Sequence, residues 1–269
     1  MKNTPFIAVT SQPVPYHADT TAIFNTLCQQ NSNSLLLDSA EIGSKNSLQS
    51  LILINAAVKI TCFGNQVTFR ALNANGKQVL KEIHPVLSQL GTVSAVNFDN
   101  EFSVQFAPLD NQLDEDSKLQ AATIFDGLRV ISNHYQHSST PVFLGGLFAY
   151  DLVANFIPMQ GVELKDDGIH CPDYSFYLAE NLITIDHQSQ QATLKSFCFS
   201  QEEQVEVAKT ALSIAQKLKN IDGVLSIKAA SDEVSTNFED PEFTGIVKAL
   251  KHHINIGDVF QIVPSRRFS

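Results

Sequence analysis

Hydrophobic and polar residues alternate one by one over residues 58–72, which is the period of a strand with one buried side. The alternation is interrupted only at Gly64 and Asn65, near the middle of the stretch. Glycine at the first position of a two-residue connection permits the positive φ of a type II′ turn. The pattern therefore predicts a β-hairpin with one face in the core and the other in water. Residues 102–106 repeat the alternation and predict a further strand.

Three more apolar stretches, at residues 142–151, 174–185 and 193–199, also predict strands. The first contains a glycine pair, which is typical of a bulge or of a place where another backbone comes close. The second ends in a turn-like segment at residues 186–188, so the second and third stretches are expected to form a hairpin.

Helical periodicity predicts helices over residues 20–30, 117–135 and 202–219. Asp19 is a suitable N-cap for the first, because its carboxylate can accept a hydrogen bond from the first helical turn. Many antiparallel strands with helices beside them predict an α+β fold with largely antiparallel sheets and flanking helices.

The last part of the chain predicts one more helix and strand. Asp240 and Pro241 open the helix, since proline suits the first turn, and Gly257 suits its C-terminal cap. An apolar run at residues 259–263 follows and predicts a terminal strand. The helix is expected to bury a stripe of apolar residues, namely Phe243, Ile246, Val247, Leu250 and Ile254.

Composition excludes several classes of protein. The 269 residues include 18 Lys+Arg and 28 Asp+Glu, a net charge of −10, which argues against a nucleic-acid-binding surface. Apolar runs are far shorter than the ~20 residues that cross a bilayer, and no secretory signal is visible, so no membrane contact is expected. The four cysteines form no CxxC pair, and three lie among apolar neighbours. Buried thiols in a reducing cytoplasm are therefore expected.

No nucleophile elbow, P-loop, dinucleotide fingerprint or HExxH pattern is present. A short apolar run at residues 35–37 predicts a buried strand that ends at Asp38 and Ser39. These two side chains could receive a ligand ammonium group, or they could cap the next turn. Gln261, a lone amide in the predicted terminal strand, could be a structural hydrogen-bond node or a site residue. For His134, a solvated helix end is favoured over a metal site.

Beyond these patterns, several stretches in collinear order resemble anthranilate synthase component I, the large subunit of that enzyme. LLLDS at residues 35–39 resembles the family's tryptophan-sensing LLLES segment, and GGLFAYDLV at residues 145–153 its GGLFxYDLV segment. GDVFQIVPSRRF at residues 257–268 resembles the strand that begins the family's chorismate-binding core. CPDYSFYLAE at residues 171–180 also fits, so the similarity spans essentially the whole chain.

The resemblance implies an enzyme that converts chorismate and ammonia to anthranilate and pyruvate in the presence of Mg²⁺. It implies a glutamine amidotransferase partner subunit as the ammonia source, and inhibition by L-tryptophan. Leu37, Asp38 and Ser39 match the tryptophan-contacting segment, although Asp38 stands where the family commonly has Glu. Gln261 matches a glutamine that faces chorismate. Water-using relatives carry lysine there, and a neutral amide is a poor base for water.

The same resemblance divides the chain into a tryptophan-sensing regulatory region at residues 1–220, a linker at 221–238 and the start of the chorismate-binding core at 239–269. The family's Mg²⁺ carboxylates and main chorismate contacts follow the point matched by Phe268. We therefore expect a chain truncated before that core is complete, without metal ligands and inactive by itself. Two alternatives stay open: a non-catalytic module that binds tryptophan or the partner, and a subunit like para-aminobenzoate synthase.

Overall fold

A computed structural model describes residues 5–29, 31–38, 48–97, 100–108, 110, 112–157, 171–221 and 234–268. The chain divides into two units, Met1–Val224 and Leu225–Ser269. In the described part of the first unit, nine strands form one antiparallel sheet in the order β1-β9-β8-β3-β4-β6-β5, with β2 paired to β3 and β7 paired to β8. The strands are β1 (Ala8–Val14), β2 (Leu35–Asp38), β3 (Gln49–Phe63), β4 (Gln66–Ala71), β5 (Thr92–Asn97), β6 (Glu101–Gln105), β7 (Leu144–Phe148), β8 (Tyr174–Asp186) and β9 (Gln191–Cys198).

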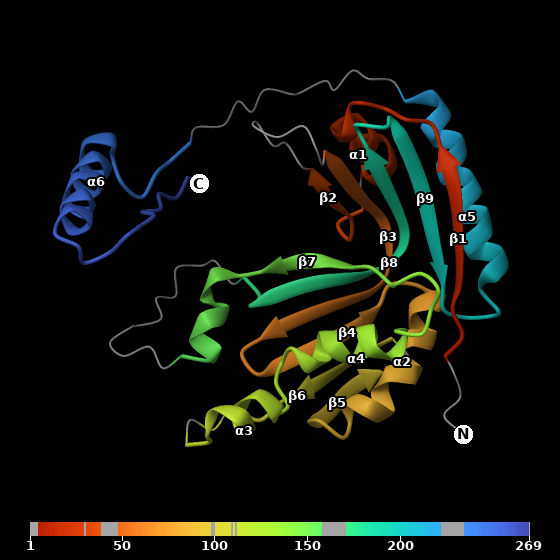
Figure 1. The fold of residues 1–269 in the computed structure, drawn as a ribbon, viewed down its shortest axis with the longest axis horizontal. Coiled ribbons are helices and arrows are strands. Elements are labelled where there is room, and N and C mark those ends of the chain that lie inside the picture. The colour runs from red at the N-terminus through yellow and green to blue at the C-terminus, as the bar shows by residue number, and fades with distance from the viewer. Residues whose placement is uncertain are drawn as a thin grey trace. The chain divides into compact units, whose positions relative to one another are not determined.

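Two long strands, β3 and β8, run through the whole sheet and divide it into two halves (Figure 1). The early part of β3 pairs with β2 and the late part of β8, which pairs in turn with β9. The late part of β3 pairs with β4 and the early part of β8, which pairs with β7. The register between β3 and β8 shifts repeatedly between Leu53 and Val58. Such bulges increase twist and bend a strand, so the two halves meet at this point.

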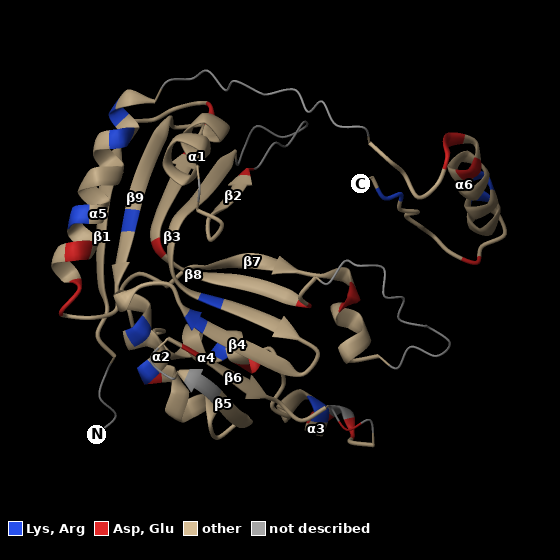
Figure 2. Ribbon diagram, turned by 180° about the vertical axis from the view of Figure 1, so that it is seen from behind, with Lys and Arg blue, Asp and Glu red and all other residues tan. Residues whose placement is uncertain are grey.

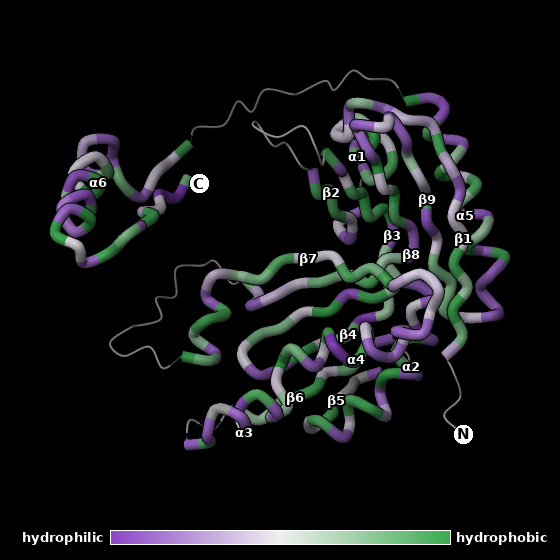
Figure 3. The backbone as a smooth tube through the Cα atoms, viewed as in Figure 1, coloured by the Kyte–Doolittle hydropathy of each residue, from purple (hydrophilic) through white to green (hydrophobic). Residues whose placement is uncertain are grey.

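Helices α1 (Thr20–Cys28) and α5 (Gln204–Lys217) pack on the half formed by β1, β9 and β2, which we call the α1–α5 half. Asp19 caps α1 as predicted, since its carboxylate accepts a hydrogen bond from Ala22 N at 2.9 Å. The tube of α5 in Figure 3 alternates between hydrophobic and hydrophilic stretches, as expected of a helix with one buried face. The buried cluster beneath both helices consists largely of β-branched side chains, among them Ile23, Ile52, Ile54, Ile183, Ile185 and Ile214.

Helices α2 (Ala74–Leu87) and α4 (Asp126–His134) cover the other half, the α2–α4 half, and lie side by side (Figure 1). Its core is larger and richer in aromatic rings, with Phe69 and Phe102 stacked at 5.1 Å and both almost fully buried. The glycine pair of β7 is a close approach of backbones, as predicted: a Cβ on Gly146 would lie 2.1 Å from Ser175 O. Only glycine therefore lets β7 pair with β8 at this spacing.

Most predicted strands are confirmed. β3 and β4 form the predicted hairpin around Gly64 and Asn65, and Gly64 has a φ of +55°. β6, β7, β8 and β9 coincide with predicted strands to within a few residues. Helix α5, followed by the 3₁₀ turn η2 (Leu218–Asn220), occupies the predicted residues 202–219.

The single helix predicted over residues 117–135 is wrong. Two helices occupy this stretch, α3 (Glu115–Gln120) and α4, and Ala121 between them has an extended backbone. The Asp126 carboxylate accepts a hydrogen bond from Thr123 N at 2.6 Å, which fixes a local turn in place of a continuous helix. Gly127 serves close packing as expected, because a Cβ there would lie 3.1–3.3 Å from side-chain atoms of three core residues.

The second unit contains α6 (Asp240–Asn255), which begins at Asp240 and Pro241 as predicted and ends before Gly257, whose φ is +84°. Two predictions for this unit are wrong. The apolar stripe is not buried, since no residue of α6 is buried and Ile254 is 40% exposed. Residues 259–263 form no strand, and Phe268 makes an isolated bridge with Thr236. A strand is stable only when it pairs with a neighbouring strand, and the described residues supply no pairing strand for residues 259–263.

Lys and Arg are scattered over several helices and strands in Figure 2, and α5 carries both signs of charge. Among the described residues, no helix combines the length and the hydropathy that a membrane span requires.

Candidate functional site

Asp38, one of the predicted ligand contacts, lies at the C-terminal end of β2, opposite Ser50 on β3. The strand is less buried than predicted: Leu37 is 43% exposed and Asp38 is also exposed. The reason is that, among the described strands, β2 pairs only with β3 and is therefore an edge strand. A ligand in water could therefore reach both side chains.

Two side chains contact Asp38 directly, and a chain of hydrogen bonds continues from one of them through His187 to Tyr16. Thr20, the first residue of α1, donates to Asp38 Oδ2 at 3.1 Å, and Ser50 Oγ donates to Oδ1. Ser50 is fully buried and its Oγ lies 2.8 Å from His187 Nε2. His187 Nδ1 lies 3.2 Å from the Tyr16 hydroxyl.

These contacts assign a direction to each hydrogen bond. Because Ser50 has a single hydroxyl proton and gives it to Asp38, His187 must donate from Nε2–H to the Ser50 oxygen. In the tautomer with its proton on Nε2, the imidazole accepts from the Tyr16 hydroxyl at Nδ1. The whole chain of donors points toward the carboxylate, so Asp38 is oriented by α1, β3 and the turn after β8. Its remaining acceptor positions can receive a ligand ammonium group.

Ser39 lies outside the described residues, as do the next residues through 47, so the turn that Asp38 was expected to cap is also outside them. Sequence reasoning missed Thr20, Ser50, His187 and Tyr16 as members of this group. His187 was visible only as part of a turn. The pairing of β2 with β3 places Ser50 opposite Asp38, and the pairing of β3 with β8 brings His187 to Ser50.

Gln261 lies in the second unit and is exposed. The alternative of a buried hydrogen-bond node is therefore wrong for the described structure. The ordered polar contacts of this unit centre on Arg266 instead. Its guanidinium lies 2.5 Å from Asp240 Oδ1 and 3.1 Å from Thr236 Oγ1. The ring of Phe268 lies 5.2 Å from it, within cation–π range.

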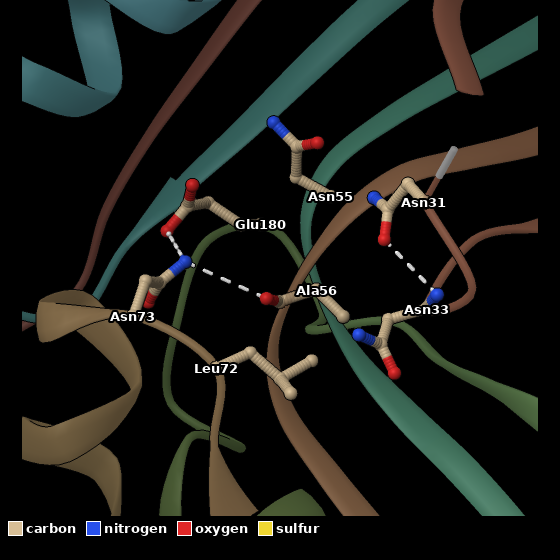
Figure 4. A pocket seen from close by; sticks show the side chains of 7 residues that line it. All are labelled: Asn31, Asn33, Asn55, Ala56, Leu72, Asn73 and Glu180. Carbon is tan, nitrogen blue, oxygen red and sulfur yellow. Dashed lines mark hydrogen bonds between the residues drawn. The ribbon is translucent and has the colours of Figure 1, made fainter. Parts of the chain in front are cut away.

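A second polar site, which sequence reasoning missed, lies where the two halves of the sheet meet (Figure 4). It contains Glu180, a carboxylate in the middle of β8 that is only 6% exposed. Burial raises the pKa of this carboxyl, while hydrogen bonds from Asn75 and Asn73 act in the opposite direction. A charged residue inside a long apolar strand was the available signal. The cavity and Asp38 lie at opposite ends of β2.

Three of the four thiols are buried, as the sequence predicts. Cys28, Cys62 and Cys198 are buried and Cys171 is exposed, and all four are free. Burial raises the pKa of Cys62 to about 12, so its nucleophilic thiolate is scarce at neutral pH.

His134 is half-buried and its Nε2 lies 2.9 Å from Glu82 Oε2, to which the buried Tyr135 hydroxyl also donates at 2.9 Å. It is therefore bonded within the protein and not simply solvated. Within the parts of the chain that the structure describes, no three or more His, Cys, Asp or Glu side chains gather as a metal site would require.

Three comparisons with known proteins bear on this geometry. Anthranilate synthase component 1 of Haemophilus influenzae is 86% identical over 264 residues, covering 98% of this chain and 51% of that protein. Anthranilate synthase component 1 of Vibrio cholerae is 41% identical over 278 residues, covering 100% of this chain and 51% of that protein. The chain therefore spans about half the length of these curated relatives. A crystal structure of anthranilate synthase component I from Streptococcus pneumoniae aligns with a TM-score of 0.44 at 16% identity, covering 86% of this chain and 43% of that one.

A family model described as chorismate binding enzyme matches residues 80–269. The match begins within α2, far upstream of residue 239, where the sequence predicted the start of the chorismate-binding core. It covers most of the first unit and all of the second. On this match, the chain belongs to the chorismate-binding enzyme family.

Proposed function

We propose that this chain is part of the large, chorismate-using subunit of an anthranilate synthase, because it spans about half the length of the curated relatives. The reaction converts chorismate and ammonia to anthranilate, pyruvate and water. One observation carries the proposal: 86% identity over 98% of the chain to anthranilate synthase component 1 of Haemophilus influenzae. The curated relatives reported above bear the same name, which supports this activity over para-aminobenzoate synthesis.

The proposal includes inhibition by L-tryptophan at Leu37, Asp38 and Ser39. The geometry supports a role for Asp38, because an exposed carboxylate held by Thr20 and Ser50 can pair with an amino acid's ammonium group. Aspartate is one methylene shorter than the family's usual glutamate, so tryptophan must approach β2 more closely. Leu37, 43% exposed beside it, offers apolar surface to the indole ring.

Gln261 is proposed to face chorismate. Its exposure leaves the amide available to a substrate. A neutral amide does not readily deprotonate water, which favours attack by ammonia over attack by water. The same proposal includes a glutamine amidotransferase partner and a cytoplasmic location. It also includes a requirement for Mg²⁺, whose ligands lie outside this chain.

The proposal can be tested in the Haemophilus influenzae relative, by replacing its aligned 264-residue segment with that of this chain. The hybrid is expected to form fluorescent anthranilate from chorismate, ammonium and Mg²⁺, and to be inhibited by L-tryptophan. A soluble, folded hybrid without anthranilate formation would contradict the proposed reaction.

The inhibitor site is tested in the same hybrid with Asp38→Ala. The L-tryptophan concentration for half inhibition is expected to rise at least about tenfold, the effect of losing one charge-assisted contact. Glu101→Ala is the matched control, because it removes a carboxylate from β6 in the other half of the sheet. Equal tryptophan sensitivity in the two variants would exclude Asp38 from the inhibitor site.

A further inference from the structure

We propose that the cavity at the bend of the sheet binds a small organic cation with N–H donors, such as a primary ammonium, with Glu180 as its anionic acceptor. The cavity is distinct from the proposed tryptophan site at Asp38, and the inference does not depend on the proposed reaction. Its volume is about 220 Å³. Cavities for drug-sized ligands hold about 300–1,000 Å³, so this one suits a ligand of few heavy atoms.

The cavity lies where the regular register between β3 and β8 fails. The register shifts on both sides of Asn55 and of Ala56, which pair with Asn181 and Ala179 on β8. Glu180 lies between these two partners and has no register partner of its own. Bulges re-aim side chains and are frequent beside functional sites. The lining is almost wholly polar and consists of Asn31, Asn33, Asn55, Ala56, Leu72, Asn73 and Glu180.

Within the part of the chain that the structure describes, only one oxygen of Glu180 accepts hydrogen bonds. Asn73 Nδ2 and Asn75 Nδ2 both donate to Oε2, at 2.9 and 2.8 Å. In Figure 4 the other oxygen, Oε1, points away from Asn73. Among the ion pairs that the described residues form, none includes Glu180. Glu180 is 6% exposed, and Oε1 is not one of the fully buried polar atoms that lack a partner, so it is open to a small ligand. Because buried charges are normally paired, a cation beside Oε1 would stabilise this carboxylate.

A purely structural role explains Oε2 and leaves Oε1 unexplained. Asn75 ties α2 to the end of β9, because it donates to Phe197 O at 3.0 Å and accepts from Phe199 N at 2.6 Å. Glu180 holds Asn75 in that position through Oε2. An uncharged glutamine could accept the same hydrogen bonds with its amide oxygen. The charge at this position therefore indicates a further partner on the cavity side.

The amides around the cavity complete a site for a donor-rich cation. Asn31 is engaged, since it donates to Ile54 O at 2.8 Å and accepts from Asn33 N at 3.0 Å. The side chains of Asn33 and Asn55 make no hydrogen bond to the described part of the protein. Their carbonyl oxygens and Glu180 Oε1 are acceptors of the lining that are not used by the described protein, and an ammonium could donate to them.

The sign of the ligand follows from the charges. A second anion would be repelled by Glu180 and by the chain's net charge of −10. Ca²⁺ is disfavoured because it takes about six to eight oxygen ligands, whereas the cavity contains a single carboxylate. A bound ammonium favours the ionised carboxylate, against the burial that raises the pKa of Glu180.

The test is a titration of the uniformly ¹⁵N-labelled chain with methylammonium chloride at constant ionic strength, following side-chain amide resonances. Saturable shifts of the Asn33 and Asn55 amides are expected. Glu180→Gln should raise the apparent Kd at least about tenfold, since it removes the charge and keeps the acceptor. Glu206→Gln, an exposed carboxylate on α5, changes the net charge equally and should leave the Kd unchanged.

Asn55→Leu provides a second variant, because it fills the cavity from the bulge without touching the bonds of Glu180. It should abolish the methylammonium shifts while the backbone spectrum stays native. Absence of saturable shifts in the original chain would overturn the inference. Equal shifts with potassium or tetramethylammonium, which lack N–H groups, would also overturn it. Unchanged methylammonium binding by Glu180→Gln would overturn it as well.

Discussion

Helices α5 and α6 have similar amphipathic patterns, but they pack very differently. α5 has 14 residues and buries Val207, Ala211 and Ile214 on the sheet. α6 has 16 residues, an equally regular apolar stripe and no buried residue. Exposed apolar side chains continue beyond α6, where Phe260 and Val263 are 103% and 78% exposed. An apolar stripe thus specifies that a helix has a face to bury, while burial itself depends on a surface supplied by other residues.

This difference can be measured because the chain contains no tryptophan and five tyrosines, which all precede residue 178. Intrinsic tyrosine fluorescence therefore follows unfolding of the first unit alone. Circular dichroism follows the helices of both units.

The largest contrast is expected between two phenylalanines. Phe69→Ala should lower the free energy of unfolding of the first unit by about 3–5 kcal/mol, because the ring is fully buried against Phe102. Phe260→Ala removes an exposed ring and should leave the unfolding free energy unchanged. Urea titrations followed by tyrosine fluorescence give both values. A loss below about 1 kcal/mol for Phe69→Ala would contradict the packing of the α2–α4 half.

Two glycines give a contrast of opposite sign. Gly146→Ala should destabilise the first unit by about 1–3 kcal/mol, because the new Cβ would collide with the backbone of Ser175 and Phe176. Gly245 lies within α6 with no atom within 4 Å of an added Cβ, so Gly245→Ala should stabilise that helix by up to about 1 kcal/mol. Thermal melts by circular dichroism measure the gain in α6, and tyrosine fluorescence measures the loss at Gly146. A neutral Gly146→Ala would show that β7 can move away from β8.

The smallest contrast concerns the helix caps. Asp19 accepts a hydrogen bond from Ala22 N, so Asp19→Ala should cost about 1 kcal/mol of unfolding free energy. Glu239 precedes α6 but makes no side-chain capping bond, and its carbonyl, which accepts from Phe243 N, survives substitution. Glu239→Ala should therefore change helix content by less than the error of circular dichroism. Asp19→Asn, which keeps the acceptor, should restore most of the loss at α1, and failure to do so would argue against capping.

Local patterns predicted local structure well. Gly64 with Asn65 between alternating residues was enough to place the β3–β4 hairpin, and Asp19 was enough to start α1. The break before α4 was missed because it depends on one hydrogen bond from Thr123 N to Asp126, which periodicity does not report. The terminal strand was wrong because its prediction assumed a pairing partner.

For the candidate sites, too, sequence patterns picked out single residues but not the distant residues that contact them. Asp38 could be picked out as a polar residue at the end of an apolar strand, and its proposed role in tryptophan binding stays a prediction. His187 lies 149 residues from Asp38 in sequence, and both side chains contact Ser50. The contact between His187 and Ser50 depends on the pairing of β3 with β8, which sequence patterns do not report. Glu180 could have been noticed as a charge in a long apolar strand, but the cavity beside it depends on the bulge at Asn55.

The two long strands have a consequence for how the first unit opens. Because β3 and β8 each belong to both halves of the sheet, neither half can lose its central pairing while the other keeps intact strands. Their paired amides should consequently exchange with solvent hydrogen only through cooperative opening of the whole unit. The edge strands β1, β2, β5 and β7 can fray separately. The first unit thus has two halves in its sheet, but its central strands should open together.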